Sequence, residues 1–287
     1  MFEMLVNPAK AEREPWEMFL VGLFYASLAV LLVHWIFSSD PVLSKYSGMI
    51  VVTFTVMLSL PFMYYLFKIE EEKDVNLEGI ESVAREHEPA LKAFLWLFLG
   101  FIVAFSFWHI LLADQLLFKA QTQTYCAINS PANIDNCVLH YDSLIKSNVA
   151  TGATTQAIRF ISILENNIYV LIFTLIFSLI FGAGAIFILA WNASVIAAAI
   201  GIFSEYQLKN IPLGVLRYMI HGLPEIAAYF VGALAGGILS IGLIKYGIKD
   251  RRLFRIATHS LILIGIALVI LVLAGLVEVY ITPAFFN

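Results

Sequence analysis

Apolar stretches long enough to cross a membrane alternate along the chain with polar segments. A crossing helix needs about 20 apolar residues, because each residue rises about 1.5 Å through a hydrocarbon core about 30 Å thick. The stretches that meet this requirement are 19–37, 49–67, 94–112, 168–191, 226–244 and 261–281. A further apolar stretch, 193–203, is shorter. The pattern predicts an all-α, polytopic bundle of transmembrane helices.

The distribution of basic residues bears on whether 193–203 crosses the membrane. Lys and Arg gather in the N-terminal tail, between the second and third apolar stretches, and before the last one. Short cytoplasmic loops carry an excess of basic residues, and these three segments share one side only if 193–203 crosses. We predict seven crossings of the cell membrane, with the N-terminus cytoplasmic and the C-terminus outside. Six crossings plus a re-entrant segment is the alternative.

Composition agrees with a membrane protein. Of 287 residues, 61% are apolar and 13% are charged, whereas soluble domains average roughly 45–50% apolar and about 25% charged. The chain carries 17 Lys and Arg against 21 Asp and Glu, a net charge of −4. Nucleic-acid binding requires a basic face, so we expect the lipid bilayer and no nucleic acid as a partner.

Both cysteines, Cys126 and Cys137, lie in one polar loop, 113–167. A structural metal site would need four ligands, such as two pairs of cysteines, so we expect neither a metal nor a cofactor. A disulfide on the outer face suits an oxidising compartment. We predict this disulfide, with two free thiols as the alternative.

The loop between the second and third apolar stretches is the most charged part of the chain. It contains the acidic segment 70–74, and Leu77, Ile80 and Val83 then follow at helical spacing. We interpret the region as a solvated amphipathic helix beneath the bundle. A docking surface for a basic cytosolic partner is the alternative.

A polar group directly precedes the apolar stretch 226–244. It comprises Arg217, His221, Pro224 and Glu225. Proline suits the first turn of a helix, where the helix dipole also favours an anion, and His221 and Glu225 are one turn apart. We interpret the group as a helix start with an ion pair to Arg217. A polar constriction or proton-binding site is the alternative. Glu278, near the end of the last stretch, is expected to reach the membrane interface.

Known catalytic patterns are missing from the sequence. It contains no HExxH metalloprotease motif, nucleophile elbow, phosphate-binding loop or paired catalytic carboxylates. We therefore expect a protein without enzymatic activity.

Small residues recur every fourth position after Glu225, at Ala228, Gly232, Gly236 and Ser240. Such spacing lets two helix backbones approach closely, and Gly182 and Gly184 place small residues in the fourth stretch. We expect these positions to pack helices within the chain. A homo-oligomer through the Gly232/Gly236 face is the alternative.

Several motifs, in order, resemble a known family. Glu-Asn-Asn-Ile occupies 165–168, a Gly-rich segment 181–187 and Ala-Trp-Asn-Ala-Ser-Val 190–195; His-Gly-Leu-Pro-Glu then occupies 221–225. Together they resemble the stage II sporulation protein M family of integral membrane proteins, in an archaeal-type version. The resemblance covers roughly 92–281. It implies a five-span core over 91–287, preceded by a two-span hairpin with the acidic loop over 1–90.

The resemblance implies a function as well as a fold. Members in spore-forming bacteria resemble non-catalytic scaffolds for peptidoglycan hydrolases, and the motifs mark Asn167, Asn192, His221 and Glu225 as the polar positions of interest. We therefore expect a scaffold or assembly protein that recruits unidentified protein partners through the acidic loop and the disulfide loop. The alternative is a channel or transporter in which the broken stretch 193–224 forms half-helices around His221 and Glu225.

Overall fold

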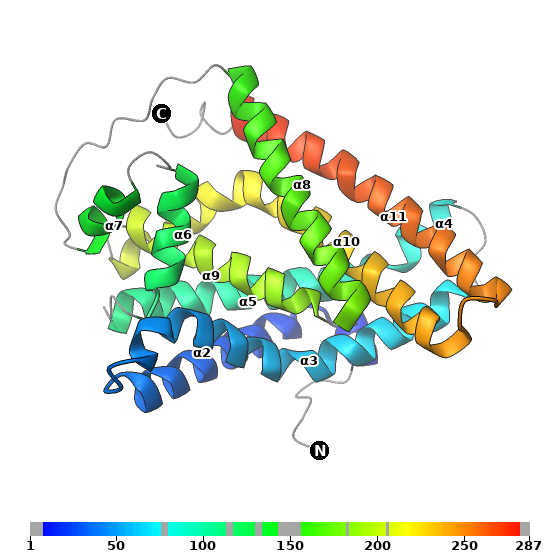
Figure 1. The fold of residues 1–287 in the computed structure, drawn as a ribbon, viewed down its shortest axis with the longest axis horizontal. Coiled ribbons are helices and arrows are strands. Elements are labelled where there is room, and N and C mark those ends of the chain that lie inside the picture. Colours follow the sequence, from blue (N-terminus) through cyan, green and yellow to red (C-terminus); the bar gives the residue numbers. More distant parts are fainter. Residues whose placement is uncertain are drawn as a thin grey trace.

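The computed structural model describes residues 8–75, 80–112, 117–129, 134–142, 156–181, 184–204 and 207–281. These residues form helices and no β-strand, and the long helices pack side by side (Figure 1). The helices are α1 (Pro8–Arg13), α2 (Glu17–Phe37), α3 (Ser47–Asp74), α4 (Ile80–Glu86), α5 (Glu88–Leu112), α6 (Lys119–Asn129), α7 (Ile134–Asp142), α8 (Gln156–Phe181), α9 (Ala185–Phe203), α10 (Ile211–Tyr246) and α11 (Arg251–Leu276). Short turns complete them: η1 (Leu43–Tyr46), η3 (Leu208–Asn210) and the π-helical turn η4 (Val277–Ile281).

Seven helices within the described residues are long and apolar enough to cross a membrane. They are α2, α3, α5, α8, α9, α10 and α11, which confirms the predicted all-α bundle of about seven crossings. Helices suit this environment because every backbone N–H inside them bonds within the same segment. Large apolar side chains such as Trp35 and Ile244 remain exposed on the outside of the bundle, as expected of a surface that faces lipid.

The boundary between the fourth and fifth crossings differs from the prediction. The apolar run 168–191 is not one helix, because α8 ends at Phe181 and α9 begins at Ala185. Gly184 lies in a turn just before α9, and glycine is a poor helix former. The stretch 193–203 is consequently the second half of α9, whose 19 residues are enough for a crossing of its own. Gly182, which was predicted to pack helices, lies outside the described residues.

The position of Pro224 also differs from the prediction. It was expected in the first turn of a helix, but α10 begins at Ile211 and contains Pro224 in its interior. Pro212 occupies the first turn instead, where the missing N–H of proline has no intrahelical partner to lose. Residues 211–224 therefore continue into the crossing helix, and the half-helices of the channel alternative are not formed there.

Helix α10 occupies the centre of the bundle and is the most buried of the crossing helices. Its small residues allow this, because a Cβ atom at Gly232 would overlap the side chain of Leu171 and one at Gly236 would lie 2.8 Å from Cβ of Ser178. Ser178 of α8 also donates to the carbonyl oxygen of Ala233 at 2.6 Å. The predicted small-residue face, with Ala228 and Ser240 buried as well, thus packs within the chain. Whether the chain forms a homo-oligomer stays a prediction.

A second close approach joins α2 to α5. A Cβ atom at Gly100 would overlap the carbonyl oxygen of Phe19, and one at Gly22 would overlap that of Leu97. The two glycines face each other, so the backbones of α2 and α5 lie in direct contact. This contact fixes the N-terminal helices against the rest of the bundle, whereas the proposed division at residue 90 stays a prediction.

The ends of the bundle differ in character. Figure 1 shows α4 at one end of the long axis and the pair α6 and α7 at the other. The C-terminal end of α3 and the N-terminal end of α11 meet near α4, where His259 contacts Asp74. We call this the Asp74 end, and the opposite one the hairpin end.

Candidate functional site

One polar cluster lies between α8, α10 and η4. Oε1 of Glu225 accepts a hydrogen bond from Nδ2 of Asn167 at 2.8 Å. Oδ1 of Asn167 in turn accepts from the hydroxyl of Tyr229 at 3.0 Å. The carboxyl group of Glu278 lies within hydrogen-bonding reach of Glu225. We call these four residues the carboxyl cluster.

The chemistry of the carboxyl cluster follows from this geometry. Asn167 and Tyr229 are almost completely buried, and a polar group inside a membrane-crossing segment is costly unless it is paired. Two neighbouring carboxylates in an apolar interior repel each other, and a proton on one of them removes that repulsion. The cluster therefore joins three elements and offers a place where a proton binds.

Only part of the predicted polar group can be placed at this cluster. Glu225 and Asn167, two of the positions that the family motifs mark, meet here, but the side chains of Arg217 and His221 lie outside the described residues. Asn192 is elsewhere, on α9, where its Nδ2 donates to the carbonyl oxygen of Ile188 one turn earlier. An amide side chain inside a helix readily makes this local bond, and no contact with Glu225 results.

Glu278, for which a position at the membrane interface stays a prediction, lies beside Glu225. The turn η4, which carries Glu278, packs against both α8 and α10. Its carboxyl group therefore faces the bundle. The sequence signal was a carboxylate near the end of a crossing, but nothing in the sequence showed which helix it would meet.

A second cluster, at the Asp74 end, was missed by the sequence analysis. Nδ1 of His87 lies 2.5 Å from Oε2 of Glu70, and its Nε2 lies 3.3 Å from Oδ1 of Asp74. The same Asp74 oxygen lies 3.1 Å from Nδ1 of His259. His87, Glu70 and Asp74 are fully buried and His259 nearly so. We call these four residues the His–Asp network; it joins α3, the residue before α5, and α11.

The predicted solvated acidic segment is thus largely buried and paired. Lys73 lies 2.7 Å from both Glu12 and Glu70. Lys245 of α10 lies 3.0 Å from Glu71, which is fully buried. The physical reason is that α3 continues as a helix through residue 74, which turns these carboxylates toward the neighbouring helices. Residues 76–79 and the side chain of Ile80 lie outside the described residues.

The pKa values of His87 and Glu12, at this end of the bundle, are both raised. Burial by itself lowers the pKa of His87, but hydrogen bonds and charge from Asp74 and Glu70 outweigh it and raise the pKa to about 9. Burial raises the pKa of Glu12 to about 7, assisted by Glu70 and opposed by Lys73. His87 is therefore a cation at neutral pH that compensates the carboxylates around it.

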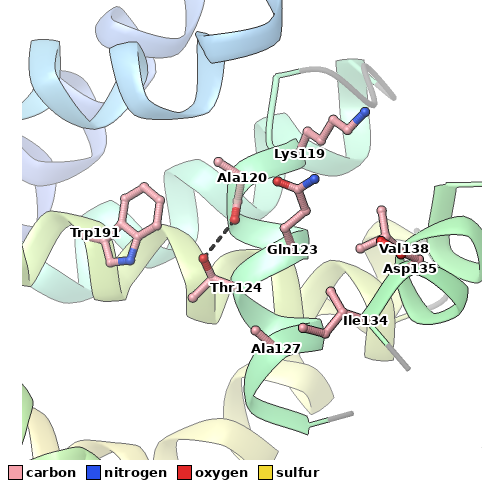
Figure 2. Close-up of a pocket in the computed structure, with 9 residues that line it drawn as sticks. All are labelled: Lys119, Ala120, Gln123, Thr124, Ala127, Ile134, Asp135, Val138 and Trp191. Atoms are coloured by element: carbon pink, nitrogen blue, oxygen red, sulfur yellow. Dashed lines mark hydrogen bonds between the residues drawn. The ribbon is translucent and has the colours of Figure 1, made fainter. Parts of the chain in front are cut away.

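At the hairpin end, α6 and α7 form a disulfide-linked pair. The predicted Cys126–Cys137 disulfide is present, and both cysteines are buried. A groove of about 680 Å³ runs beside the pair (Figure 2). Its lining comes from α6, α7 and Trp191 of α9: Lys119, Ala120, Gln123, Thr124, Ala127, Ile134, Asp135, Val138 and Trp191. We call it the α6–α7 groove.

A buried amide attaches the hairpin to the bundle. Nε2 of Gln121 donates to the carbonyl oxygen of Gly48 at 2.9 Å and to Oγ of Ser194 at 3.2 Å. Gln121 is fully buried, as are Leu117 and Phe118 just before it. The hairpin therefore has a fixed position against α3 and α9. Within the part of the chain that the structure describes, no three His, Cys, Asp or Glu side chains are grouped to hold a metal ion.

Comparison with known proteins identifies the family. A family model described as Stage II sporulation protein M matches residues 93–283. The chain belongs to the Stage II sporulation protein M family. The match covers α5 to η4, and so includes the hairpin and the carboxyl cluster, whereas α1 to α4 precede it.

One relative supports an archaeal-type member. An uncharacterized protein of Methanocaldococcus jannaschii, MJ0793, is 32% identical over 129 residues, which cover 43% of this chain and 71% of the relative. No solved structure matches the chain significantly. The family membership and the seven apolar helices together describe a multi-pass membrane protein.

The pKa of His87 generates a prediction about stability. A histidine whose pKa rises from 6.5 to about 9 in the folded state stabilises the protein fully below pH 6.5 and loses that contribution as the pH rises through 9. We expect the free energy of unfolding of the full chain in detergent to fall by about 3 kcal/mol over this range. Denaturant titrations between pH 7.5 and 9.5, above the range in which Glu12 titrates, should show about 2 kcal/mol of this fall.

The variant His87→Gln should lose most of this pH dependence, because the amide keeps a hydrogen bond but carries no charge. His34→Gln, on α2, is the matched control and should keep it. A slope that persists unchanged in His87→Gln would contradict the assignment.

Proposed function

We propose that this family member is a non-catalytic membrane assembly protein that holds a partner protein in the α6–α7 groove. The observation that carries the proposal is a disulfide-linked hairpin fixed to the helical bundle by the buried side chain of Gln121. A preorganised surface loses little conformational entropy when it binds. A loop tied to the bundle in this way suits a docking role better than a free one.

The lining of the groove indicates the kind of partner. Ile134, Val138 and Trp191 offer apolar contacts, while Lys119 and Asp135 offer charges of opposite sign. Such a surface suits a peptide segment with an apolar side chain between polar neighbours. The acidic segment 70–74 is a weaker candidate for recruitment than the sequence suggested, because its Glu70, Glu71 and Asp74 are buried within the chain.

We further propose that the N-terminus and the Asp74 end lie on the cytoplasmic side and the hairpin lies outside. The basic segments predicted to share the cytoplasmic side include Lys73 and Lys245, and both bind carboxylates at the Asp74 end. This common location supports the orientation by the rule for basic loops. It also leaves the disulfide on the side where an oxidising environment would maintain it.

Photo-crosslinking tests the docking role. A photoreactive amino acid replaces Gln123 or Ala127 of the full chain in its native membrane, and both positions are exposed and line the groove. We expect each to give an adduct of defined mass with the same protein, identified by mass spectrometry. The control is Ile128, which is exposed on the same helix but does not line the groove.

The yield of the adduct should also fall in the double variant Cys126→Ser, Cys137→Ser, because the disulfide that links α6 to α7 beside the groove is then missing. An equal adduct from position 128, or crosslinks to lipid alone from positions 123 and 127, would contradict the docking role.

A second candidate function, a channel or transporter that binds a proton, is supported by the carboxyl cluster. Glu225 and Glu278 come together within the crossing part of the chain, and Asn167 orients Glu225. Paired ionisable groups at such positions commonly mark proton pathways. Such a function does not require the half-helices expected from the sequence, because Glu225 lies on the continuous helix α10.

Proton flux into liposomes tests this candidate with purified full-length protein. If it transports, wild-type protein should give a flux that Glu225→Gln abolishes, because the amide cannot exchange the proton. Glu165→Gln, an exposed position on α8, is the matched control and should keep the flux. Absence of flux from wild-type protein, with folding verified, would exclude proton transport as the function.

A further inference from the structure

A basic cavity lies along the first turns of α11, away from the groove and the carboxyl cluster. Its volume is about 460 Å³, and its described lining is Arg251, Phe254, Arg255, Thr258 and His259. These residues are three or four positions apart and therefore share one face of the helix. Two guanidinium groups and an imidazole thus converge on one hollow.

Two of these side chains are held in place by the bundle. Arg255 donates from Nη1 to the carbonyl oxygen of Val75 at 2.7 Å, which leaves its other N–H groups for a further acceptor. His259 is only 8% exposed, and its Nδ1 is bound to Asp74. Of the His–Asp network, His259 lines the cavity, and its contact with Asp74 holds this side chain in place.

Two other basic residues nearby are already engaged. Lys245 binds Glu71, and Arg252 binds Asp250 while its guanidinium lies over the ring of Tyr246. The positive charge of the cavity itself therefore comes mainly from Arg251 and Arg255. Both side chains are exposed, and planar guanidinium groups suit the oxygens of a phosphate.

Large apolar side chains are exposed in the same part of the chain. Phe254 in the cavity lining is 79% exposed, and Ile244 and Ile248 just before α11 are 83% and 85% exposed. They lie where α10 ends and α11 begins, at the limit of two crossing helices. A free phosphate ion would gain nothing from such neighbours, whereas the acyl chains of a lipid would cover them.

We propose that this cavity binds the headgroup of an anionic phospholipid. Arg251 and Arg255 contact the phosphate, and Phe254 packs against the adjoining part of the acyl chains. Basic pockets at the ends of crossing helices favour anionic headgroups over zwitterionic ones. Binding there would hold α11 against α3 through Arg255 and His259.

The test measures lipid retention by native mass spectrometry of the full chain in mild detergent. The probes are phosphatidylglycerol and phosphatidylcholine with the same acyl chains. We expect wild-type protein to prefer phosphatidylglycerol, and Arg251→Gln to weaken its binding about fivefold. Lys249→Gln is the matched control: it removes the same charge two residues earlier, in the turn before α11 and outside the cavity lining, and should leave binding nearly unchanged.

Two further measurements distinguish a lipid headgroup from a free phosphate ion. Phe254→Ala should weaken phosphatidylglycerol binding, and millimolar inorganic phosphate should not displace the lipid. Equal losses from Arg251→Gln and Lys249→Gln would show a diffuse charge effect and overturn the site. Efficient displacement by inorganic phosphate, or no preference for phosphatidylglycerol, would also overturn it. Unfolding midpoints of each variant establish that the protein remains folded.

Discussion

The arrangement of the helices depends on a buried carboxylate, that of Asp74. One of its oxygens contacts both His87 and His259, so three segments of the chain meet at a single atom. A carboxylate without a partner in an apolar interior is far too costly to persist, so these segments cannot shift along one another. The Lys245–Glu71 pair adds α10 to the same end of the bundle. Along the bundle, the small residues of α10 pack it against α8, which brings Glu225 beside Asn167.

This interaction also connects two parts of the chain with different relationships to the family. His259 and Lys245 lie within the residues that match Stage II sporulation protein M, whereas Asp74 and His87 precede them. The N-terminal helices are therefore held to the family core by charge at one end and by the Gly22–Gly100 contact along their length. The charged residues named here pair with one another inside the chain. The hairpin and the basic face of α11 are therefore the surfaces suited to recognition.

Much of the fold could be predicted from the sequence, because the length of an apolar run is dictated by the thickness of the membrane. The break between α8 and α9 was missed, since hydropathy does not register where one apolar helix ends and the next begins. The burial of Glu70 and Asp74 was missed because a charged residue shows its partner only when the neighbouring helix is known. Asn167 and Glu225 were identified through family motifs, but their contact depends on the packing of α8 against α10.

The most direct test of this account is a double-mutant cycle between Asp74 and His259. Asp74→Asn, His259→Gln and the double variant of the full chain are unfolded in detergent, and the free energies of unfolding are compared. Because the two side chains share one contact across α3 and α11, we expect a coupling energy of about 1 kcal/mol or more. Effects that add to within about 0.5 kcal/mol would contradict the claim that this carboxylate holds the helices together.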